Sequence, residues 1–445
     1  MVKTPADRNK ILNAFRPGSA IDIPAQFAGR KYEIETLVDT LHADGACPIV
    51  YGERGLGKTS LALQIERIAL GDTELLDELS LPDRILPEDQ RFTTFFFFCS
   101  DGISSKDELL QRLINTAEGF DVHAPLPNRL DSRQVTTKIS LKFFEQEVQK
   151  TFSSGDAGRR FESLSVEEKF EIVTRRVVDK NNTRVLYIID ELDRLKDSKG
   201  LASLIKNLSS RDTKFLLVGV GQSVSTLLHD HASLERTLVQ VPVYLMGDED
   251  SSDIIHKTES LLAQSGFDIK FSENAIKRTV EASGGFPWFV HTIAQEALKI
   301  AYGDDLRLVG DPQVNKAIGM LSSHRFGQQF YDTYQMAVGD SRQREVVLRL
   351  FAKWSDLDLP SSELYPLAHD LRVANPAALV KQLMRHEYGG VLVRPPYAPA
   401  RVFRFTNAMF KRYVNLSNSV YIGVGKEVDE VWKKHIENLR QTRPR

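Results

Sequence analysis

Short apolar runs rich in β-branched and aromatic residues alternate with longer amphipathic segments through the first half of the chain. Most of these runs are continuous, as expected for parallel strands that are covered by helices on both faces. We therefore expect a parallel α/β sheet whose strands are joined by crossover helices. The predicted strands are Pro48–Tyr51, Phe92–Cys99, Arg184–Ile189, Phe215–Val220 and Leu238–Leu245.

Amphipathic periodicity predicts helices over Tyr32–Leu41 and Lys58–Leu70, on either side of the first strand. The stretch 101–182 is long for a single crossover, and 124–133 combines two prolines with few apolar residues. We expect an exposed loop or an inserted arm there. The helices predicted in this insertion are Lys106–Glu118, Ser140–Phe152 and Val166–Asp179.

The β pattern stops after Gly247, and helical periodicity punctuated by glycines follows. We therefore divide the chain into a core over 1–247 and a small all-helical lid over 248–321. The helices predicted in the lid are Ser251–Ser265, Ser272–Ala282, Pro287–Ala301 and Asp311–Leu321.

The next segment, 322–418, predicts helices followed by a β-hairpin, which is the order of a winged helix. Its predicted helices are Phe326–Val338, Arg342–Trp354, Ser361–Leu371 and Pro376–His386, and its strands are Val391–Arg394 and Val402–Phe405. Residues 419–445 predict a C-terminal helix that is either a packing helix or an oligomer contact. Its apolar side carries Val428, Val431, Trp432 and Ile436.

The composition narrows the class of protein. A chain of 445 residues with 42% hydrophobic and 27% charged residues is typical of a soluble protein with two or three domains. The net charge of -2 gives no overall attraction to DNA or anionic lipid, so a nucleic-acid site must be a local patch. No segment approaches the roughly 20 apolar residues of a membrane span. The two cysteines, Cys47 and Cys99, lie far apart in the sequence, as expected for free thiols in a reducing cytoplasm. We therefore expect a cytoplasmic protein, and without a membrane span we expect no membrane partner.

One glycine-rich turn carries the main chemical indication. It follows a predicted strand, precedes a predicted helix and matches the G-x-x-x-x-G-K-[ST] pattern. Its backbone N–H groups and the following helix start would cradle the phosphates of ATP. Lys58 would reach the β- and γ-phosphates, and the Thr59 hydroxyl would bind Mg²⁺. The predicted binding residues are Gly52, Glu53, Arg54, Gly55, Leu56, Gly57, Lys58, Thr59 and Ser60.

A second indication is the apolar strand Val185–Ile189, which ends in Asp190 and Glu191. The tip of a central strand emerges beside the phosphates. Asp190 would hold the magnesium, and Glu191 would act as the general base that polarises the attacking water.

Together these residues resemble the additional-strand, catalytic-glutamate P-loop ATPases, in particular the AAA+ and STAND branches and the ATPases similar to origin-recognition proteins. Pro24–Arg30 looks like the F-x-G-R box that precedes the P-loop in that group, which implies that Arg30 lies near the adenine. The resemblance implies ATP and Mg²⁺ as cofactors and a homo-oligomer that forms on ATP binding.

The same resemblance implies three further site residues. After the strand Lys214–Val220, Gln222 stands at the sensor-1 tip, with Ser223 as the next choice. Arg236 stands where AAA+ proteins carry an arginine finger, although a surface arginine at a helix end is an equal alternative. The Gly-Gly-Phe-Pro-Trp run lacks the sensor-2 arginine, and Pro287 resembles the base-packing proline of STAND and transposition-regulator ATPases. This departure favours a nucleotide-dependent switch over a motor.

Positive charge gathers in the predicted winged helix. Residues 371–415 hold eight basic residues and one acid, a net charge of +7. A helix with Lys381 and Arg385 and a wing with Arg394 and Arg401 have the form of a DNA-reading helix with backbone clamps. In the alternative, the winged helix packs on the ATPase core and reads its nucleotide state.

These observations lead to two hypotheses. The first is an AAA+-like ATPase that acts on double-stranded DNA in replication, transposition or defence against mobile elements and phage. The second is a STAND-like signalling ATPase that regulates a partner effector protein. A small-molecule kinase fits poorly, because such enzymes are compact and do not need a lid and a winged helix.

Overall fold

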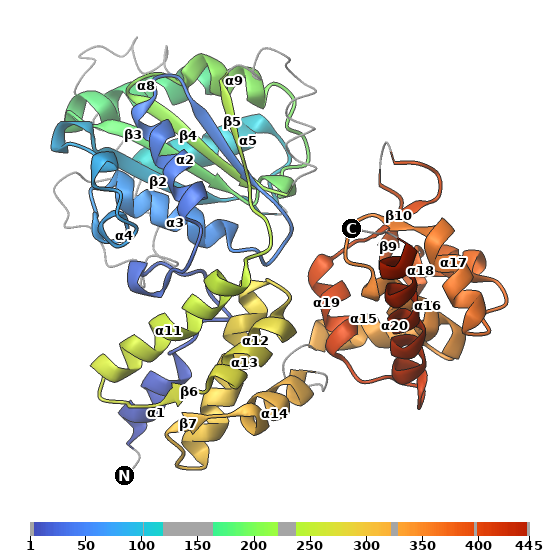
Figure 1. Ribbon diagram of the computed structural model, residues 1–445. Coiled ribbons are helices and arrows are strands. Elements are labelled where there is room, and N and C mark those ends of the chain that lie inside the picture. Colours follow the sequence, from blue (N-terminus) through green and yellow to red (C-terminus); the bar gives the residue numbers. More distant parts are fainter. Residues whose placement is uncertain are drawn as a thin grey trace. The chain divides into compact units, whose positions relative to one another are not determined.

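The computed structural model describes residues 4–100, 102–118, 163–220, 237–321, 328–395 and 398–442. They form two compact units (Figure 1). The sheet unit comprises residues 20–53 and 57–244, and the helical unit comprises residues 1–19, 54–56 and 245–445. The predicted helix Ser140–Phe152 lies outside the described residues. Among the described helices, none has both the length and the hydropathy to span a bilayer.

The sheet unit is built on five parallel strands in the order β2-β3-β4-β1-β5. Every predicted strand is present, so the predicted P-loop type of parallel sheet is confirmed. The strand β4 separates β1 from β3, which makes this the additional-strand arrangement. The bounds are β1 (Cys47–Tyr51), β2 (Phe92–Phe98), β3 (Arg184–Asp190), β4 (Thr213–Gly219) and β5 (Leu238–Pro242).

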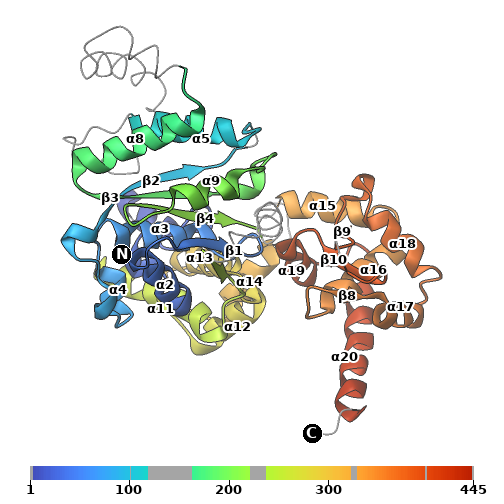
Figure 2. The same ribbon diagram turned by 90° about the horizontal axis from the view of Figure 1, so that it is seen from above.

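Helices cover both faces of this sheet, as the continuous apolar strands predict (Figure 2). On one face lie α2 (Lys31–His42) and α3 (Lys58–Ala69), and the short α4 (Glu74–Glu78) packs beside α3. The other face carries α5 (Lys106–Glu118), α8 (Val166–Asn181) and α9 (Leu201–Leu208).

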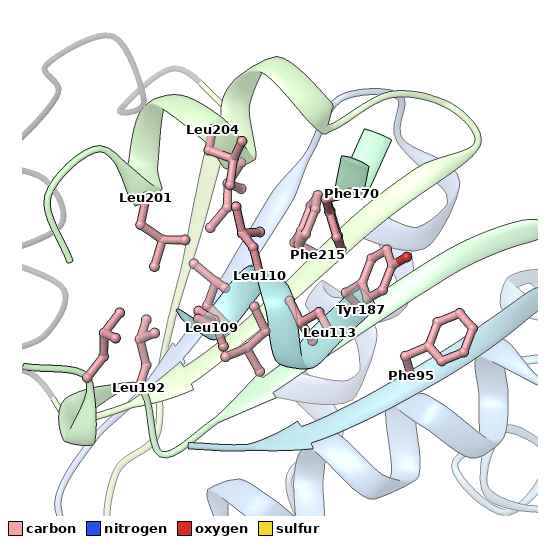
Figure 3. Packing of buried hydrophobic residues seen from close by; sticks show 14 of the residues in the cluster. Phe95, Leu109, Leu110, Leu113, Phe170, Tyr187, Leu192, Leu201, Leu204 and Phe215 are labelled. Atoms are coloured by element: carbon pink, nitrogen blue, oxygen red, sulfur yellow. The ribbon is translucent and has the colours of Figure 1, made fainter. Parts of the chain in front are cut away.

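A row of aromatic side chains fixes the register of the central strands (Figure 3). Phe95, Tyr187 and Phe215 are direct partners across β2, β3 and β4. Their rings stack with centroids 5.3 Å and 5.5 Å apart. Phe170 of α8 packs on Tyr187 at 4.9 Å, and the Tyr187 hydroxyl is hydrogen-bonded to Thr174 at 2.9 Å. A one-residue slip of β3 would break both ring stacks, so this row holds the end of β3 in place.

The helical unit contains the helices predicted for the lid, together with an N-terminal helix. They are α1 (Pro5–Leu12), α11 (Asp248–Gln264), α12 (Glu273–Ser283), α13 (Pro287–Gly303) and α14 (Asp311–Leu321). The expectation of an all-helical region was wrong in one detail. Two short parallel strands, β6 (Lys270–Phe271) and β7 (Leu308–Val309), pair between these helices. Strands of two residues have no periodicity to detect.

Among the remaining elements, those from Arg342 to Phe405 follow the helix, strand, helix, helix, hairpin order of winged-helix domains. Their three-stranded sheet has the order β8-β10-β9. The predicted domain limits stay a prediction, because these elements share one compact unit with the preceding helices. The elements are α15 (Gln328–Val338), α16 (Arg342–Lys353), β8 (Leu359–Pro360), α17 (Ser361–Asp370), α18 (Pro376–Leu383), β9 (Leu392–Val393), β10 (Val402–Phe405) and α19 (Ala408–Leu416).

The C-terminal helix α20 (Val424–Thr442) packs against α16. Val424 and Val428 are fully buried, and the ring of Trp432 meets that of Trp354 edge-on at 5.9 Å. Of the two alternatives for this helix, the contacts support a packing role.

A buried ion pair ties α16 to the chain between α19 and α20. Glu345 is fully buried and accepts hydrogen bonds from the Tyr334 hydroxyl (2.5 Å), Arg349 Nε (3.0 Å) and the N–H groups of Val420 and Tyr421 (2.7 and 2.8 Å). Arg349 also donates to the Ser417 carbonyl at 3.0 Å. The carboxylate is thus satisfied on every side, which is the condition for a charge to be tolerated in a core.

We expect Glu345→Ala to lower the free energy of unfolding by about 3–5 kcal/mol, because it leaves the Arg349 guanidinium buried without its counter-charge. Denaturant titration checks this value. Arg342→Ala is the matched control, since it removes an exposed pair between α16 and Glu427 of α20 and should cost less than about 1 kcal/mol. Equal losses of unfolding free energy in the two variants would show that burial does not increase the contribution of the Glu345–Arg349 pair to stability.

Candidate functional site

The glycine-rich turn connects the end of β1 to the start of α3. Gly55 and Gly57 have φ values of 80° and 88°, in the left-handed region that favours glycine. Gly57 caps α3, so the first N–H groups of the helix face the turn. This geometry provides a concave set of backbone donors for an anion.

Lys58 folds back over the same turn. Its Nζ donates to the carbonyl oxygens of Gly52 at 2.9 Å and Glu53 at 2.8 Å. The ammonium group is therefore held above the turn by weak, neutral acceptors. A phosphate oxygen carries a full charge and would compete well for these donors.

The two predicted phosphate motifs meet at one hydrogen bond. The Thr59 hydroxyl at the start of α3 donates to Asp190 Oδ2 at 2.7 Å. Asp190 is the last residue of β3 and is 2% exposed. Because β1 and β3 are parallel strands of one sheet, their carboxyl ends reach the same edge. The expectation that Asp190 lies beside the turn is met by this contact.

Asp190 has the properties of a magnesium ligand. Burial raises the pKa of its carboxyl group, while the hydrogen bonds from Thr59 and the Glu191 N–H act in the opposite direction. A divalent cation would favour the charged form of this buried acid. The hydroxyl of Thr59 and this carboxylate are both hard oxygen donors, which suits Mg²⁺. The residues present therefore fit the metal.

Glu191 follows in an unusual conformation. Its φ of 56° and ψ of 39° lie in the left-handed region, which costs a residue with a Cβ free energy. Its carboxylate is engaged side-on by Arg194, with Nε to Oε2 at 2.9 Å and an NH2 contact to Oε1 at 3.4 Å. Nothing in the sequence indicates a role for Arg194, because neither periodicity nor the motif distinguishes it from other surface arginines.

The model of the KAP family P-loop domain matches residues 30–236. This match spans just under half of the 445 residues. It includes the glycine-rich turn, Lys58, Thr59, Asp190 and Glu191. Residues 30–236 are a P-loop domain. No curated protein matches the sequence.

Several solved structures are similar to the whole chain at low identity. The ORC2 protein of Aeropyrum pernix has 13% identity and a TM-score of 0.46, over 91% of this chain and 94% of that chain. A Walker-type ATPase of Pyrococcus abyssi has 16% identity and a TM-score of 0.45, over 87% and 96%. The chain thus resembles origin-recognition-like ATPases, as the motifs predict.

Other predicted binding residues of the P-loop domain have contacts of their own. The Ser60 hydroxyl accepts from the Ile21 N–H at 2.9 Å, which holds the preceding segment against α3. Arg30 donates to Glu33 at 3.0 Å and to the Tyr244 carbonyl at 2.8 Å. Its role near the adenine stays a prediction. Glu53 and Arg54 are exposed, as expected if the turn contributes its backbone.

The remaining nucleotide-site predictions are not settled by the described residues. Gln222, Ser223 and Arg236 fall in 221–236, outside the described residues, although β4 does end just before them. Pro287 begins α13 in the helical unit, so its role at the nucleotide base stays a prediction.

His291, one turn after Pro287, is a core residue. It is 7% exposed, and its Nδ1 accepts from the Arg16 N–H at 3.4 Å. Its ring packs edge-on against Phe15 at 6.0 Å. Burial, with the charge of Arg16 as a smaller cause, lowers the pKa of His291 to about 4. These contacts are those of a packed, neutral histidine.

Three of the eight basic residues between 371 and 415 contact other elements of the helical unit, and a fourth, Arg385, pairs with the nearby Glu387 at 3.4 Å. Arg404 pairs with Asp358, and Lys411 donates to the Asp356 carbonyl at 2.7 Å. Arg412 Nε donates to the Ala282 carbonyl at 2.9 Å, and its NH2 donates to the Glu281 carbonyl. Arg412 thus contacts the end of α12, within the predicted lid.

The residues predicted to contact DNA remain on the surface. Lys381 and Arg385 are exposed on one side of α18 and just after it, while Val380 is buried on the other side. Arg394 lies over the Phe403 ring at 5.5 Å, and Arg401 is exposed before β10. In the described part of the chain, Lys381 and Arg401 have no ion-pair partner.

His291 predicts an acid-dependent loss of stability. Its folded pKa lies below the 6.5 of the unfolded chain, so the unfolded state binds more protons between pH 4 and pH 6.5. Stability is therefore complete above pH 6.5 and falls as the pH drops through this window, by about 2 kcal/mol between pH 7.5 and pH 5. Unfolding of His291→Gln measured at both pH values should show a smaller fall. His256→Gln, at an exposed position, is the control, and identical pH dependence in both variants would rule out His291 as the titrating group.

Proposed function

We propose that this chain binds ATP with Mg²⁺ and hydrolyses it as a nucleotide-dependent switch or assembly factor on double-stranded DNA. The single observation that carries the ATPase part is the 2.7 Å hydrogen bond between Thr59 and Asp190. It joins the two motifs that have separate tasks in phosphoryl transfer, the one that binds phosphate and the one that holds the metal.

In this proposal each residue has a defined task. The N–H groups of Gly55, Gly57 and the start of α3 bind the phosphates, and Lys58 leaves its carbonyl partners to contact the γ-phosphate. Thr59 and Asp190 hold Mg²⁺, which neutralises charge on the phosphates. Glu191 accepts the proton of the attacking water.

The proposal that the protein binds DNA rests on exposed positive charge. Lys381 lies on the exposed side of α18 and Arg385 just after it, and Arg394 and Arg401 lie at the wing. In a winged helix these positions face the groove and the phosphates. We further propose that ATP binding drives a homo-oligomer in which Arg236 of one subunit completes the site of its neighbour, with Gln222 as the sensor of the γ-phosphate.

A second candidate function is a STAND-like switch that regulates an effector protein. The observation that favours it is the contact of Arg412 with the carbonyls at the end of α12, directly before the Gly284–Pro287 turn. Trp288 of α13 also meets Phe330 of α15 edge-on at 6.1 Å. These contacts would let the winged helix respond to a change at this turn.

Substitutions in the P-loop domain test the ATPase proposal. Glu191→Gln should leave ATP binding unchanged and lower kcat by about 10²–10⁴-fold, because it removes the proton acceptor and keeps the shape. Lys58→Ala should lose binding. Phosphate release and binding of a fluorescent ATP analogue measure the two effects, with Glu171→Gln on α8 as the control. Wild-type turnover in Glu191→Gln would exclude Glu191 as the base.

The salt dependence of DNA binding tests the second part. With about four phosphate contacts, affinity for duplex DNA with ATP should fall roughly a hundredfold between 50 and 200 mM salt, and Lys381→Ala/Arg385→Ala should reduce the slope by about 2. Lys433→Ala/Lys434→Ala removes the same charge from the exposed side of α20 and should not change the slope. Absence of binding at low salt, with ADP retained by the purified protein, would favour the STAND-like function instead.

A further inference from the structure

We propose that Arg194 is a positioning residue that holds the carboxylate of Glu191 in a resting ion pair, which must open before Glu191 accepts a proton. This inference rests on the proposed ATPase function and concerns the regulation of the same site. It starts from the turn that follows β3, in which Glu191 precedes the short 3-10 helix η4 (Leu192–Arg194).

The turn fixes both members of the pair. Its backbone closes through a hydrogen bond from the Arg194 N–H to the Glu191 carbonyl at 2.9 Å. Leu192 is 3% exposed and belongs to the core beneath α5 and α9 (Figure 3). Leu195, 8% exposed, anchors the other side of Arg194 in the same core. The left-handed backbone at Glu191 and these two anchors bring the side chains at positions 191 and 194 together.

The pair occupies the atoms that the reaction needs. In hydrolysis the water oxygen bonds to the γ-phosphorus, the bond to the ADP oxygen breaks, and Glu191 takes the water proton on one carboxylate oxygen. Both of these oxygens face the Arg194 guanidinium, at 2.9 and 3.4 Å. The carboxylate must turn at least one oxygen away from Arg194 to accept the proton.

The strength of the restraint follows from its exposure. The side chains of Arg194 and Glu191 are 36% and 43% exposed, so water and salt screen the pair and it shifts an equilibrium by only about 2- to 5-fold. Arg194 is thus a weak restraint that lowers the turnover of the nucleotide-bound protein by this factor.

The test is steady-state ATP hydrolysis by the full-length chain with Arg194→Ala. We expect kcat to rise about 2- to 5-fold with an unchanged KM, because the exposed pair contributes about that factor and the phosphate-binding residues are untouched. Arg194→Lys, which keeps the charge and loses the side-on geometry, should give an intermediate kcat. Arg175→Ala breaks an exposed pair with Glu171 on α8 and is the matched control; it should not change kcat.

Ionic strength provides a second readout that a purely structural role would not affect. At saturating Mg-ATP, higher salt should raise kcat of the wild type toward that of Arg194→Ala, and the variant should change less. An unchanged or lower kcat in Arg194→Ala, with wild-type hydrolysis intact and Glu191→Gln inactive, would overturn this inference alone. Absence of hydrolysis in the wild type would overturn the proposed function as well.

Discussion

The arrangement of the P-loop domain depends on the bond between the Thr59 hydroxyl and the Asp190 carboxylate. The two residues are 131 positions apart in the sequence, so the contact is made by the fold and not by neighbouring residues. The bond exists because β1 and β3 run parallel with β4 between them and because Phe95, Tyr187 and Phe215 lock the register of the central strands. Burial raises the pKa of the Asp190 carboxyl group, and a cation bound beside it would stabilise the charged form.

Much of this arrangement is readable from the sequence. Continuous apolar runs locate all five strands, since a strand covered on both faces leaves no polar positions. The P-loop pattern and the Asp-Glu pair after Ile189 identify the residues that meet at the sheet edge. The pattern fails where elements are too short to have a period, as in β6, β7 and β8. It also fails at Arg194, whose contact with Glu191 depends on a left-handed backbone that no spacing rule predicts.

Charge counting has a similar limit. The net charge of +7 between residues 371 and 415 treats every cation as available to a partner. The structure pairs Arg404, Lys411 and Arg412 with acceptors on other elements and Arg385 with Glu387, and it leaves Lys381 and Arg401 exposed without an ion-pair partner among the described residues. The difference is physical: a long basic side chain near an uncapped helix end or a loop carbonyl gains more from that acceptor than from solvent. Only the fold shows which basic residues have such an acceptor nearby.

The backbone at Glu191 also bears on how this protein can evolve. Asn and Gly adopt a left-handed conformation more easily than Glu does, so either replacement relieves strain at the end of β3 while it removes the proposed proton acceptor. On the proposed function, a replacement that stops hydrolysis at this position would also relieve backbone strain. Selection for turnover would then keep glutamate there, and a lineage that needs nucleotide binding alone is expected to drift to Asn or Gly.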